Sequence, residues 1–489
     1  MKISIPLAEI NKGESAISSR DSFKIHNGYI FNDGLRKGVT KRPGYAVYND
    51  DTVTNPTRSI IYSPFIDAPG NTWWVDSALK VWKNGTEGDT ATNLYTLNGV
   101  TWAEDETYVY LHGGAVSGGT ANSDYRITKS NATLTEITDA DMPIKLASTD
   151  VVPGVVHLDG YIFVAANVGV DSRIYNSDLG SMTAWTSTSF ISAALESDAL
   201  VYIAKHRNHV VTFGTTSIEF FYDAGNPTGS PLSRRSDIYY KVGLVSHTLA
   251  ETEKNSKSRV AEYGDTLFFV GKPDKGAVGI FALDNFQLSR ISTPAIDYVL
   301  QLEGDTVIRG IVIFNNKAFL VLQADWEDTS SLVYDISEKV WYVWSVVYTR
   351  GVVSGRLAGG TSSRGVIDAN PIVYTVTGVQ DAGTNPAFTI ITPKVDNIDP
   401  NKNTSHLRKF NSKLSIGSDN PGSATLISVS YADDDYQTYS TARTLDINNY
   451  AASLSGLGSF FERAYKLSYT GSNNLKLYTL NLDLDLGMK

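Results

Sequence analysis

The stretch VAEYGDTLFFVGKPDKGAVGIFAL (residues 260–283) contains the repeating pattern that decides the fold of this chain. An apolar run ends in a Gly-Asp turn, a second apolar run follows at residues 266–270, and a third lies at residues 278–283. Short runs rich in aromatic and β-branched residues, separated by Gly, Asn and Asp, are typical of antiparallel strands joined by tight turns. The stretch therefore predicts a β-meander.

The same pattern occurs six times between residues 59 and 346. The second runs, which we expect to be the core strands, lie at residues 72–75, 107–111, 161–164, 209–213, 266–270 and 317–322. Their starts are about 35 to 57 residues apart, a spacing that brackets the length of a four-stranded propeller blade. Further strands at residues 351–360, 364–369 and 372–377 form a seventh blade or close the ring. We expect an irregular β-propeller of about six or seven blades.

More polar runs after the third strands predict the outer strands of the blades, because an edge strand must resist pairing with other chains. These runs lie at residues 93–97, 133–138, 287–292 and 340–346. Apolar residues cluster instead of recurring at helical spacing, so little helix is expected. The two candidate helices are residues 192–200 and 294–301.

Two regions lie outside the repeat. We expect an N-terminal arm at residues 1–55, a propeller at residues 56–379 and a C-terminal β domain at residues 380–489. The boundary before the C-terminal domain falls in a Gly- and Pro-containing stretch, residues 378–386, as linkers often do. The predicted fold class is all-β: a propeller plus a β-sandwich-like platform that the two terminal regions form together in space.

Composition excludes several kinds of site. The 489 residues carry a formal net charge of -10 and contain no cysteine, which rules out disulfides, thiol chemistry and cysteine-based zinc sites. Binding duplex DNA through counterion release needs clustered Lys and Arg, which this balance does not supply. We expect a soluble protein without a secretion signal or a membrane-spanning segment.

No catalytic, cofactor-binding or metal-binding residue is assigned, and the chain is predicted not to be an enzyme. His206 and His209 are three residues apart, but on a turn and a strand they need not share a face. Ser177, Asp178 and Trp185 resemble part of a sialidase Asp box with the wrong spacing, so Asp178 is interpreted as a turn residue. No cofactor is expected.

Two kinds of charged group are also candidate binding sites. The acidic cluster at residues 433–435 resembles the start of a calcium loop but lacks its Gly and distal Glu, which favours a solvated hairpin tip. The basic residues form small, scattered groups that we interpret as solvated faces or salt bridges, with DNA contact as the alternative. These groups are Lys37, Lys41 and Arg42; Lys205 and Arg207; Arg234 and Arg235; and Arg408, Lys409 and Lys413.

Several phrases in order along the chain resemble one protein family. HVVTFGTTSIEFFYDAGNP (residues 209–227) followed by YKVGL (residues 240–244) resembles part of the packaged-DNA stabilisation proteins of short-tailed bacteriophages, also called tail hub or nozzle proteins. KRPG (residues 41–44) and IYNSDLGSMTAW (residues 174–185) resemble other phrases of that family, as do residues 431–436 and 463–486.

The resemblance implies a ring of six subunits below the portal and adaptor rings of a phage tail. Such a nozzle retains the packaged genome and channels it during ejection, and the DNA passes through without specific binding. The implied partners are the adaptor protein, a needle or plug at the tip, and tail fibres or tailspikes. The implied location is the virion, after synthesis in the cytoplasm of a bacterial host. The family carries no catalytic residues to transfer.

Two other functions remain open on the sequence. A carbohydrate-binding or glycoside-processing propeller would gather Trp and Tyr with paired carboxylates at one mouth of the propeller. A kelch-type scaffold is suggested by VYDISEKVWYVW (residues 333–344), although most units lack the Gly-Gly signature. The tryptophans are interpreted as blade packing: Trp73, Trp74, Trp82, Trp102, Trp326, Trp341 and Trp344.

Overall fold

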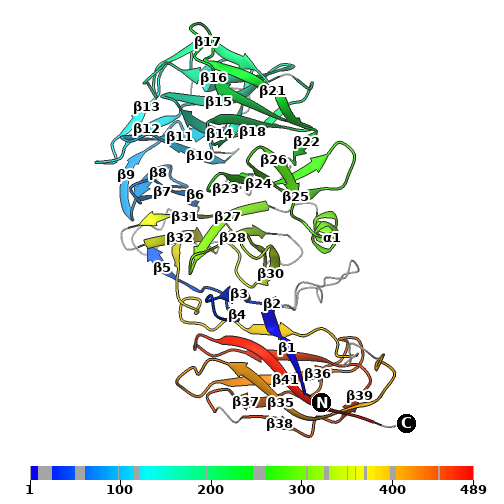
Figure 1. Ribbon diagram of the computed structural model, residues 1–489. Helices are drawn as coiled ribbons and strands as arrows, with labels where there is room; N and C mark the ends of the chain where they lie inside the picture. Colours follow the sequence, from blue (N-terminus) through cyan, green and yellow to red (C-terminus); the bar gives the residue numbers. More distant parts are fainter. Residues whose placement is uncertain are drawn as a thin grey trace. The chain divides into compact units, whose positions relative to one another are not determined.

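The computed structural model describes residues 2–8, 25–49, 61–96, 99–114, 122–193, 195–245, 260–303, 307–323, 330–349, 351–357, 360–367, 372–396, 403–449 and 452–487. The fold is almost entirely β, with 57% strand and 3% helix (Figure 1). The chain divides into two compact units. Unit 1 comprises Met1–Ala46, Thr329–Val346 and Val376–Lys489, and unit 2 comprises Val47–Asp328 and Val347–Thr375.

Unit 2 is built from small antiparallel sheets that follow one another along the chain. The first four sheets have four strands each. Their strands are β6 (Ile61–Ile66), β7 (Thr72–Asp76), β8 (Lys80–Lys83) and β9 (Thr86–Thr90); β10 (Val100–Glu104), β11 (Tyr108–Gly113), β12 (Tyr125–Thr128) and β13 (Leu134–Glu136); β14 (Thr149–Leu158), β15 (Tyr161–Val168), β16 (Asp171–Ser177) and β17 (Trp185–Ser192); and β18 (Leu200–His206), β19 (His209–Gly214), β20 (Ile218–Asp223) and β21 (Leu232–Tyr240).

The remaining strands of unit 2 complete the ring. The fifth sheet contains β22 (Val242–Leu244), β23 (Val260–Tyr263), β24 (Thr266–Pro273), β25 (Gly279–Asp284) and β26 (Gln287–Arg290), and helix α1 (Pro294–Glu303) follows it. Next come β27 (Val307–Phe314) with β28 (Lys317–Gln323), and then β31 (Gly351–Leu357), β32 (Gly360–Val366) and β33 (Val373–Val376). Strand β31 contacts both β27 and β6, so the last strands close the ring against the first sheet. These features confirm the predicted propeller.

Close backbone contacts between neighbouring blades explain two glycines of the innermost strands. A Cβ atom on Gly154 of β14 would lie 2.2 Å from the carbonyl oxygen of Ile203 on β18. A Cβ atom on Gly310 of β27 would lie 1.9 Å from the carbonyl oxygen of Val352 on β31. Both glycines also have positive φ, at 101° and 130°, which other residues rarely adopt. Only glycine therefore lets these strands approach each other so closely.

Most of the expected strands are confirmed, and two expectations are wrong. The six core runs are β7, β11, β15, β19, β24 and β28, and α1 covers the second candidate helix. The described part of residues 192–200 contains no helix, because the Asp198 carboxylate accepts the backbone N–H groups of Thr216 and Ser217 and holds its segment in a loop. The described residues 93–96 form no strand, and the polar β9 is the outer strand of that blade instead.

Unit 1 contains two sheets to which both ends of the chain contribute. One has the order β3-β4-β41-β35-β38, with β1 on β41 and β39 on β35; the part of the other that belongs to unit 1 has the order β37-β36-β40-β34-β2-β30-β29. Blue N-terminal strands thus lie among orange and red C-terminal ones (Figure 1). The strands are β1 (Lys2–Pro6), β2 (Ile25–His26), β3 (Gly28–Asn32), β4 (Lys37–Lys41), β29 (Ser331–Asp335), β30 (Val340–Trp344), β34 (Phe388–Ile391), β35 (Lys409–Ser418), β36 (Leu426–Ala432), β37 (Arg443–Asp446), β38 (Leu454–Ser455), β39 (Ser459–Phe460), β40 (Ala464–Tyr469) and β41 (Lys476–Leu486).

The two sheets of unit 1 share a buried interior. Leu480, Leu482 and Leu484 alternate along β41 and are fully buried, as expected for a strand with one face in the core. Asn411 on β35 donates a hydrogen bond of 2.7 Å to the Tyr465 hydroxyl on β40, which links one sheet to the other. The N-terminal arm and the C-terminal region thus form the β platform that the sequence predicted.

Candidate functional site

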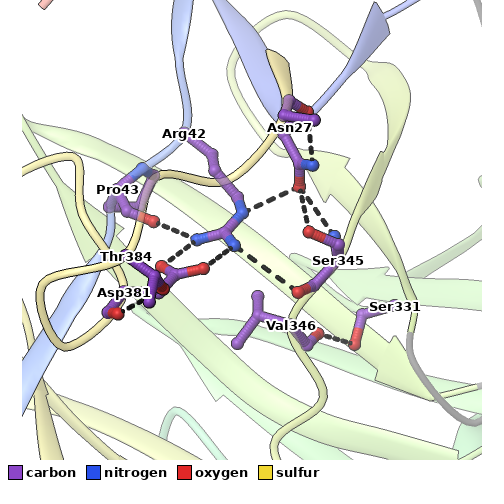
Figure 2. Close-up of polar contacts among 9 residues, drawn as sticks. Asn27, Arg42, Pro43, Ser331, Ser345, Val346, Asp381 and Thr384 are labelled. Carbon is purple, nitrogen blue, oxygen red and sulfur yellow. Dashed lines mark hydrogen bonds and ion pairs between the residues drawn. The ribbon is translucent and has the colours of Figure 1, made fainter. Parts of the chain in front are cut away.

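A buried arginine joins three distant segments of unit 1. Arg42, which follows β4, is 0% exposed and ion-pairs through two nitrogens with the Asp381 carboxylate (Figure 2). Its Nε donates to Asn27 Oδ1 at 2.9 Å, and its Nη1 donates to the Pro43 carbonyl at 2.8 Å. Nη2 also reaches the Ser345 carbonyl at 3.5 Å. The guanidinium charge is therefore balanced and surrounded by oxygen acceptors, as a buried cation requires.

Asn27 and Gly44 fix the chain on either side of this arginine. The Asn27 side chain accepts the backbone N–H of Ser345 at 2.7 Å and donates to the Ala387 carbonyl at 2.7 Å. Gly44 exchanges backbone hydrogen bonds with residues 377 and 378, and a Cβ atom on it would lie 2.0 Å from the Gln380 carbonyl oxygen. The Arg-Pro-Gly phrase thus holds the predicted linker region against the N-terminal strands.

Lys41 is also buried in this region. Its Nζ donates to the Gly471 carbonyl at 2.7 Å and lies 5.5 Å from the centre of the Tyr469 ring. Burial, together with the nearby charge of Arg42, lowers the pKa of Lys41 to about 8. Lys41 and Arg42 therefore serve the interior of unit 1, and neither is free to contact DNA.

The innermost strands of unit 2 surround a cavity of about 570 Å³. The strands β6, β10, β14, β18, β23, β27 and β31 all contribute to its wall, which indicates seven blades. Phe65, Trp102, Tyr202 and Tyr263 line the cavity together with one carboxylate, Glu262. Glycoside hydrolysis by a carboxylate pair needs a second carboxylate. The paired carboxylates expected of a glycoside-processing propeller are not among the residues that line this cavity.

The remaining tryptophans mostly pack inside the protein. Trp73, Trp74, Trp82, Trp341 and Trp344 are buried, which agrees with their interpretation as packing residues, and Trp326 lies outside the described residues. The indole N–H groups of Trp73 and Trp82 donate to the buried carboxylates of Asp67 and Asp76, at 2.9 and 2.8 Å.

The histidine pair and the Asp box phrase have structural roles. His206 and His209 both lie against the Phe286 ring, at 4.9 and 4.7 Å, and burial lowers the pKa of each. Asp178 lies in the turn after β16 and accepts a hydrogen bond of 3.2 Å from the Thr186 hydroxyl. Across the described residues, no group of three His, Asp or Glu side chains could hold a metal ion.

The acidic cluster of residues 433–435 lies in the turn after β36, and cations inside the chain neutralise part of it. Asp433 binds Arg463 through two hydrogen bonds of 2.6 and 2.7 Å. Lys394 approaches Asp435 at 2.6 Å, while Asp434 accepts the backbone N–H of Thr438. The three carboxylates do not converge on one point, which agrees with a hairpin tip.

Most of the scattered basic groups also have partners within the chain. Lys37 pairs with Glu338, Arg207 with Asp265, Arg234 with Glu219 and Arg235 with Asp237. Lys205 donates to the His157 carbonyl, and the buried Lys409 donates to three backbone carbonyls. The Arg408 guanidinium lies 5.8 Å from the centre of the Phe461 ring, and Lys413 is exposed. These residues do not form one basic surface.

One buried charge network was not found in the sequence. His112 on β11 is 0% exposed, and its Nδ1 lies 2.7 Å from Asp124 while its Nε2 lies 3.2 Å from the Val152 carbonyl. Burial lowers the pKa of His112, but the charge of Asp124 and the hydrogen bonds to Asp124 and the Val152 carbonyl together outweigh burial, so the net pKa is raised. Both neighbours are acceptors, so the doubly protonated ring fits here. The two residues are twelve apart in sequence, and no motif spacing marks them.

A match to a family model identifies the protein family of this chain. The family model described as "Bacteriophage P22 Gp10, beta-propeller" matches residues 111–355, which is half of the chain. The chain belongs to this family. Its members are the packaged-DNA stabilisation proteins of bacteriophages, which have a structural role in the phage. The matched segment lies mostly in the propeller of unit 2.

Solved structures similar to this chain add little. The chain is similar to an exo-β-1,3-galactanase from Phanerochaete chrysosporium, with 9% identity over 86% of this chain and 100% of that chain and a TM-score of 0.31. It is also similar to a puromycin-hydrolyzing peptidase from Mycobacterium tuberculosis, with 9% identity over 72% and 61% and a TM-score of 0.40. Neither likeness supports an argument about function. No curated protein matches the chain. The described residues include no helix long and apolar enough to cross a membrane.

Proposed function

We propose that this protein forms the tail nozzle, or hub, of a short-tailed phage. In this proposal it assembles as a homohexameric ring below the adaptor, retains the packaged DNA and channels it during ejection, without catalysing a reaction. Its partners are the adaptor, a needle or plug, and tail fibres or tailspikes, and it is made in the host cytoplasm before joining the virion. Membership of the phage stabilisation family is the observation that carries the proposal.

The charge distribution supports a conduit that does not grip DNA. Phosphate contacts by Lys and Arg hold a nucleic acid through counterion release, so a channel for a sliding genome should offer few of them. The chain has 42 basic and 52 acidic residues, and many of the scattered basic groups are engaged in internal pairs. An electrophoretic shift of duplex DNA by the purified protein that weakens with salt would contradict this part of the proposal.

Unit 1 is proposed as the platform that builds the ring, with residues 1–55, 56–379 and 380–489 as arm, propeller and platform domain. Its large exposed apolar side chains include Phe410, Leu426 and Phe461, at 44%, 57% and 54% exposure. Such side chains are common at protein interfaces. They are the first candidates for contacts between subunits.

Electron microscopy of the purified full chain tests the proposal. Rings with six-fold symmetry and a central hole are expected, whereas monomers at all concentrations would refute the nozzle. Changing Phe410, Leu426 and Phe461 together to Lys should abolish the rings. The matched control changes Val170 and Leu179, exposed turn residues of unit 2, to Lys and should leave the rings intact. If the rings survive the triple change, these unit 1 side chains do not build them.

A further inference from the structure

The wall of the central cavity carries aromatic side chains on several strands and one carboxylate. Phe65 on β6 and Trp102 on β10 stack with ring centres 5.8 Å apart and an interplanar angle of 8°. Glu262 lies on β23, which is separated from β10 by β14 and β18 in the order of the ring. The aromatic pair and the carboxylate therefore lie on different sides of a cavity whose volume suits a small molecule.

The Glu262 carboxylate has no partner among the residues that the structure describes: no hydrogen bond or ion pair reaches it. Lys205 and Asp265 are the charged groups that act on it from nearby, but Lys205 donates to the His157 carbonyl and Asp265 pairs with Arg207. Glu262 is exposed at the cavity wall, and the protein atoms around it raise the pKa of its carboxyl to about 7. A cation that enters the cavity can therefore reach a carboxylate that has no partner within the described residues.

The other charged residue of the wall does not offer that counter-ion. Arg309 on β27 is 6% exposed, and its Nε donates to Gln323 Oε1 at 2.9 Å. An anionic ligand would be repelled by Glu262, and the Arg309 guanidinium already donates a hydrogen bond to Gln323. A cation would be attracted by the carboxylate, and aromatic rings such as Trp102 and Tyr263 attract cations through their negative faces.

We propose that the central cavity of the propeller binds a small organic ammonium ion, with Glu262 as its counter-ion and the aromatic side chains of Phe65, Trp102, Tyr202 and Tyr263 against its alkyl groups. The site does not depend on assembly of the proposed hexamer, because unit 2 alone supplies every one of these residues. Binding selects the ionised carboxylate, so below neutral pH the proton of Glu262 is released to solvent as the cation binds.

Calorimetric titration of the full chain with choline tests this proposal. The neutral isostere 3,3-dimethylbutan-1-ol keeps the shape of choline without its charge and should bind at least about tenfold more weakly. With a carboxyl pKa of about 7, the ionised fraction rises roughly tenfold between pH 6 and pH 8, so the affinity for choline should rise about tenfold over this range.

Variants locate the site. Glu262→Gln keeps the side-chain shape and should weaken choline binding at least about tenfold and remove its dependence on pH. Glu87→Gln, on the exposed outer strand β9, should leave binding unchanged. The proposal is overturned if choline does not bind at tens of millimolar, if the neutral isostere binds equally well, or if Glu262→Gln binds choline like the unmodified protein. Preferential binding of an uncharged sugar such as methyl glucoside would also overturn it. Unlike the test of the nozzle, none of these results depends on rings.

Discussion

Replacing Asp381 with Asn removes the charge that balances Arg42 and should strongly destabilise unit 1. Arg42 is 0% exposed, and among the described residues Asp381 is the one carboxylate to which its guanidinium is bonded. Removing one partner of a buried ion pair typically costs about 3–5 kcal/mol, because the remaining charge stays buried. Arg42 keeps the oxygens of Asn27, Pro43 and Ser345 as acceptors, so we expect the lower end, about 3 kcal/mol.

Hydrogen exchange measured by mass spectrometry is the suitable assay, because two units need not unfold in a single transition. In Asp381→Asn, peptides covering β2 and β34 should lose about 3 kcal/mol of protection, while peptides of β11 and β15 in unit 2 should not change. The matched control is Asp419→Asn, which weakens the exposed pair with Arg36 in the same unit and should cost about 1 kcal/mol or less.

The double variant Arg42→Met/Asp381→Leu distinguishes two costs, the loss of the attraction between Arg42 and Asp381 and the burial of an Arg42 charge without a partner. Replacing both partners with apolar side chains removes the buried charge altogether, so it should cost less than Asp381→Asn alone. The reasoning would be refuted if Asp381→Asn behaved like the Asp419→Asn control. It would also be refuted if the double variant lost as much stability as the single variants Arg42→Met and Asp381→Leu lose when their effects are added.

Three further predictions concern stability. Gly310→Ala should lower the free energy of unfolding by at least about 2 kcal/mol, because the new Cβ atom meets the Val352 carbonyl and alanine rarely adopts this φ. Gly169 also has a positive φ but no atom near the position of a Cβ, so Gly169→Ala measures the backbone strain without the clash. Thermal denaturation measures the stability of both variants. Because the pKa of His112 is raised above 6.5, its pairing with Asp124 stabilises the fold fully below pH 6.5 and loses this effect as the pH rises through the raised pKa. The melting temperature should therefore fall with rising pH between pH 5.5 and 8.5, and Asp124→Asn should abolish this dependence. The pKa of Lys41 is lowered from 10.5 to about 8, so the folded state binds fewer protons than the unfolded state between pH 8 and pH 10.5. Stability should therefore rise with pH over this range by up to about 3 kcal/mol. Denaturation midpoints measure this rise, and Lys41→Met should lack it.

The hairpins of the propeller could be predicted because their signals are local. Asn315 and Asn316 form the turn between β27 and β28 with φ of 49° and 59°, and Asp159 and Gly160 form the turn between β14 and β15 with φ of 49° and 85°. Asn, Asp and Gly tolerate positive φ better than other residues, so their position between two apolar runs specifies the turn. Strand β9 escaped prediction because its sequence, TEGDT, has no apolar residue to mark it.

The sites depend on long-range contacts and could not be predicted in the same way. Arg42 and Asp381 are 339 residues apart, and nothing in the sequence around either residue indicates its partner. The cavity requires one strand from each of seven blades, so the isolation of Glu262 becomes visible only after the ring has closed. Sequence spacing reports neighbours along one strand or turn, whereas these sites are made of neighbours across the fold.

The KRPG phrase of residues 41–44, which carries part of the family resemblance, has a role in folding. Lys41 and Arg42 are buried, the Pro43 carbonyl accepts from Arg42, and Gly44 has no space for a side chain, so the phrase serves the interior of unit 1. In the proposed ring, the contacts between subunits would come from exposed residues such as Leu426. Two variants distinguish these roles: Asp381→Asn weakens the interior without changing the exposed apolar side chains, so its rings should be lost on warming and return on cooling. The Phe410, Leu426 and Phe461 to Lys variant alters only the surface and should form no rings at any temperature at which unit 1 is folded.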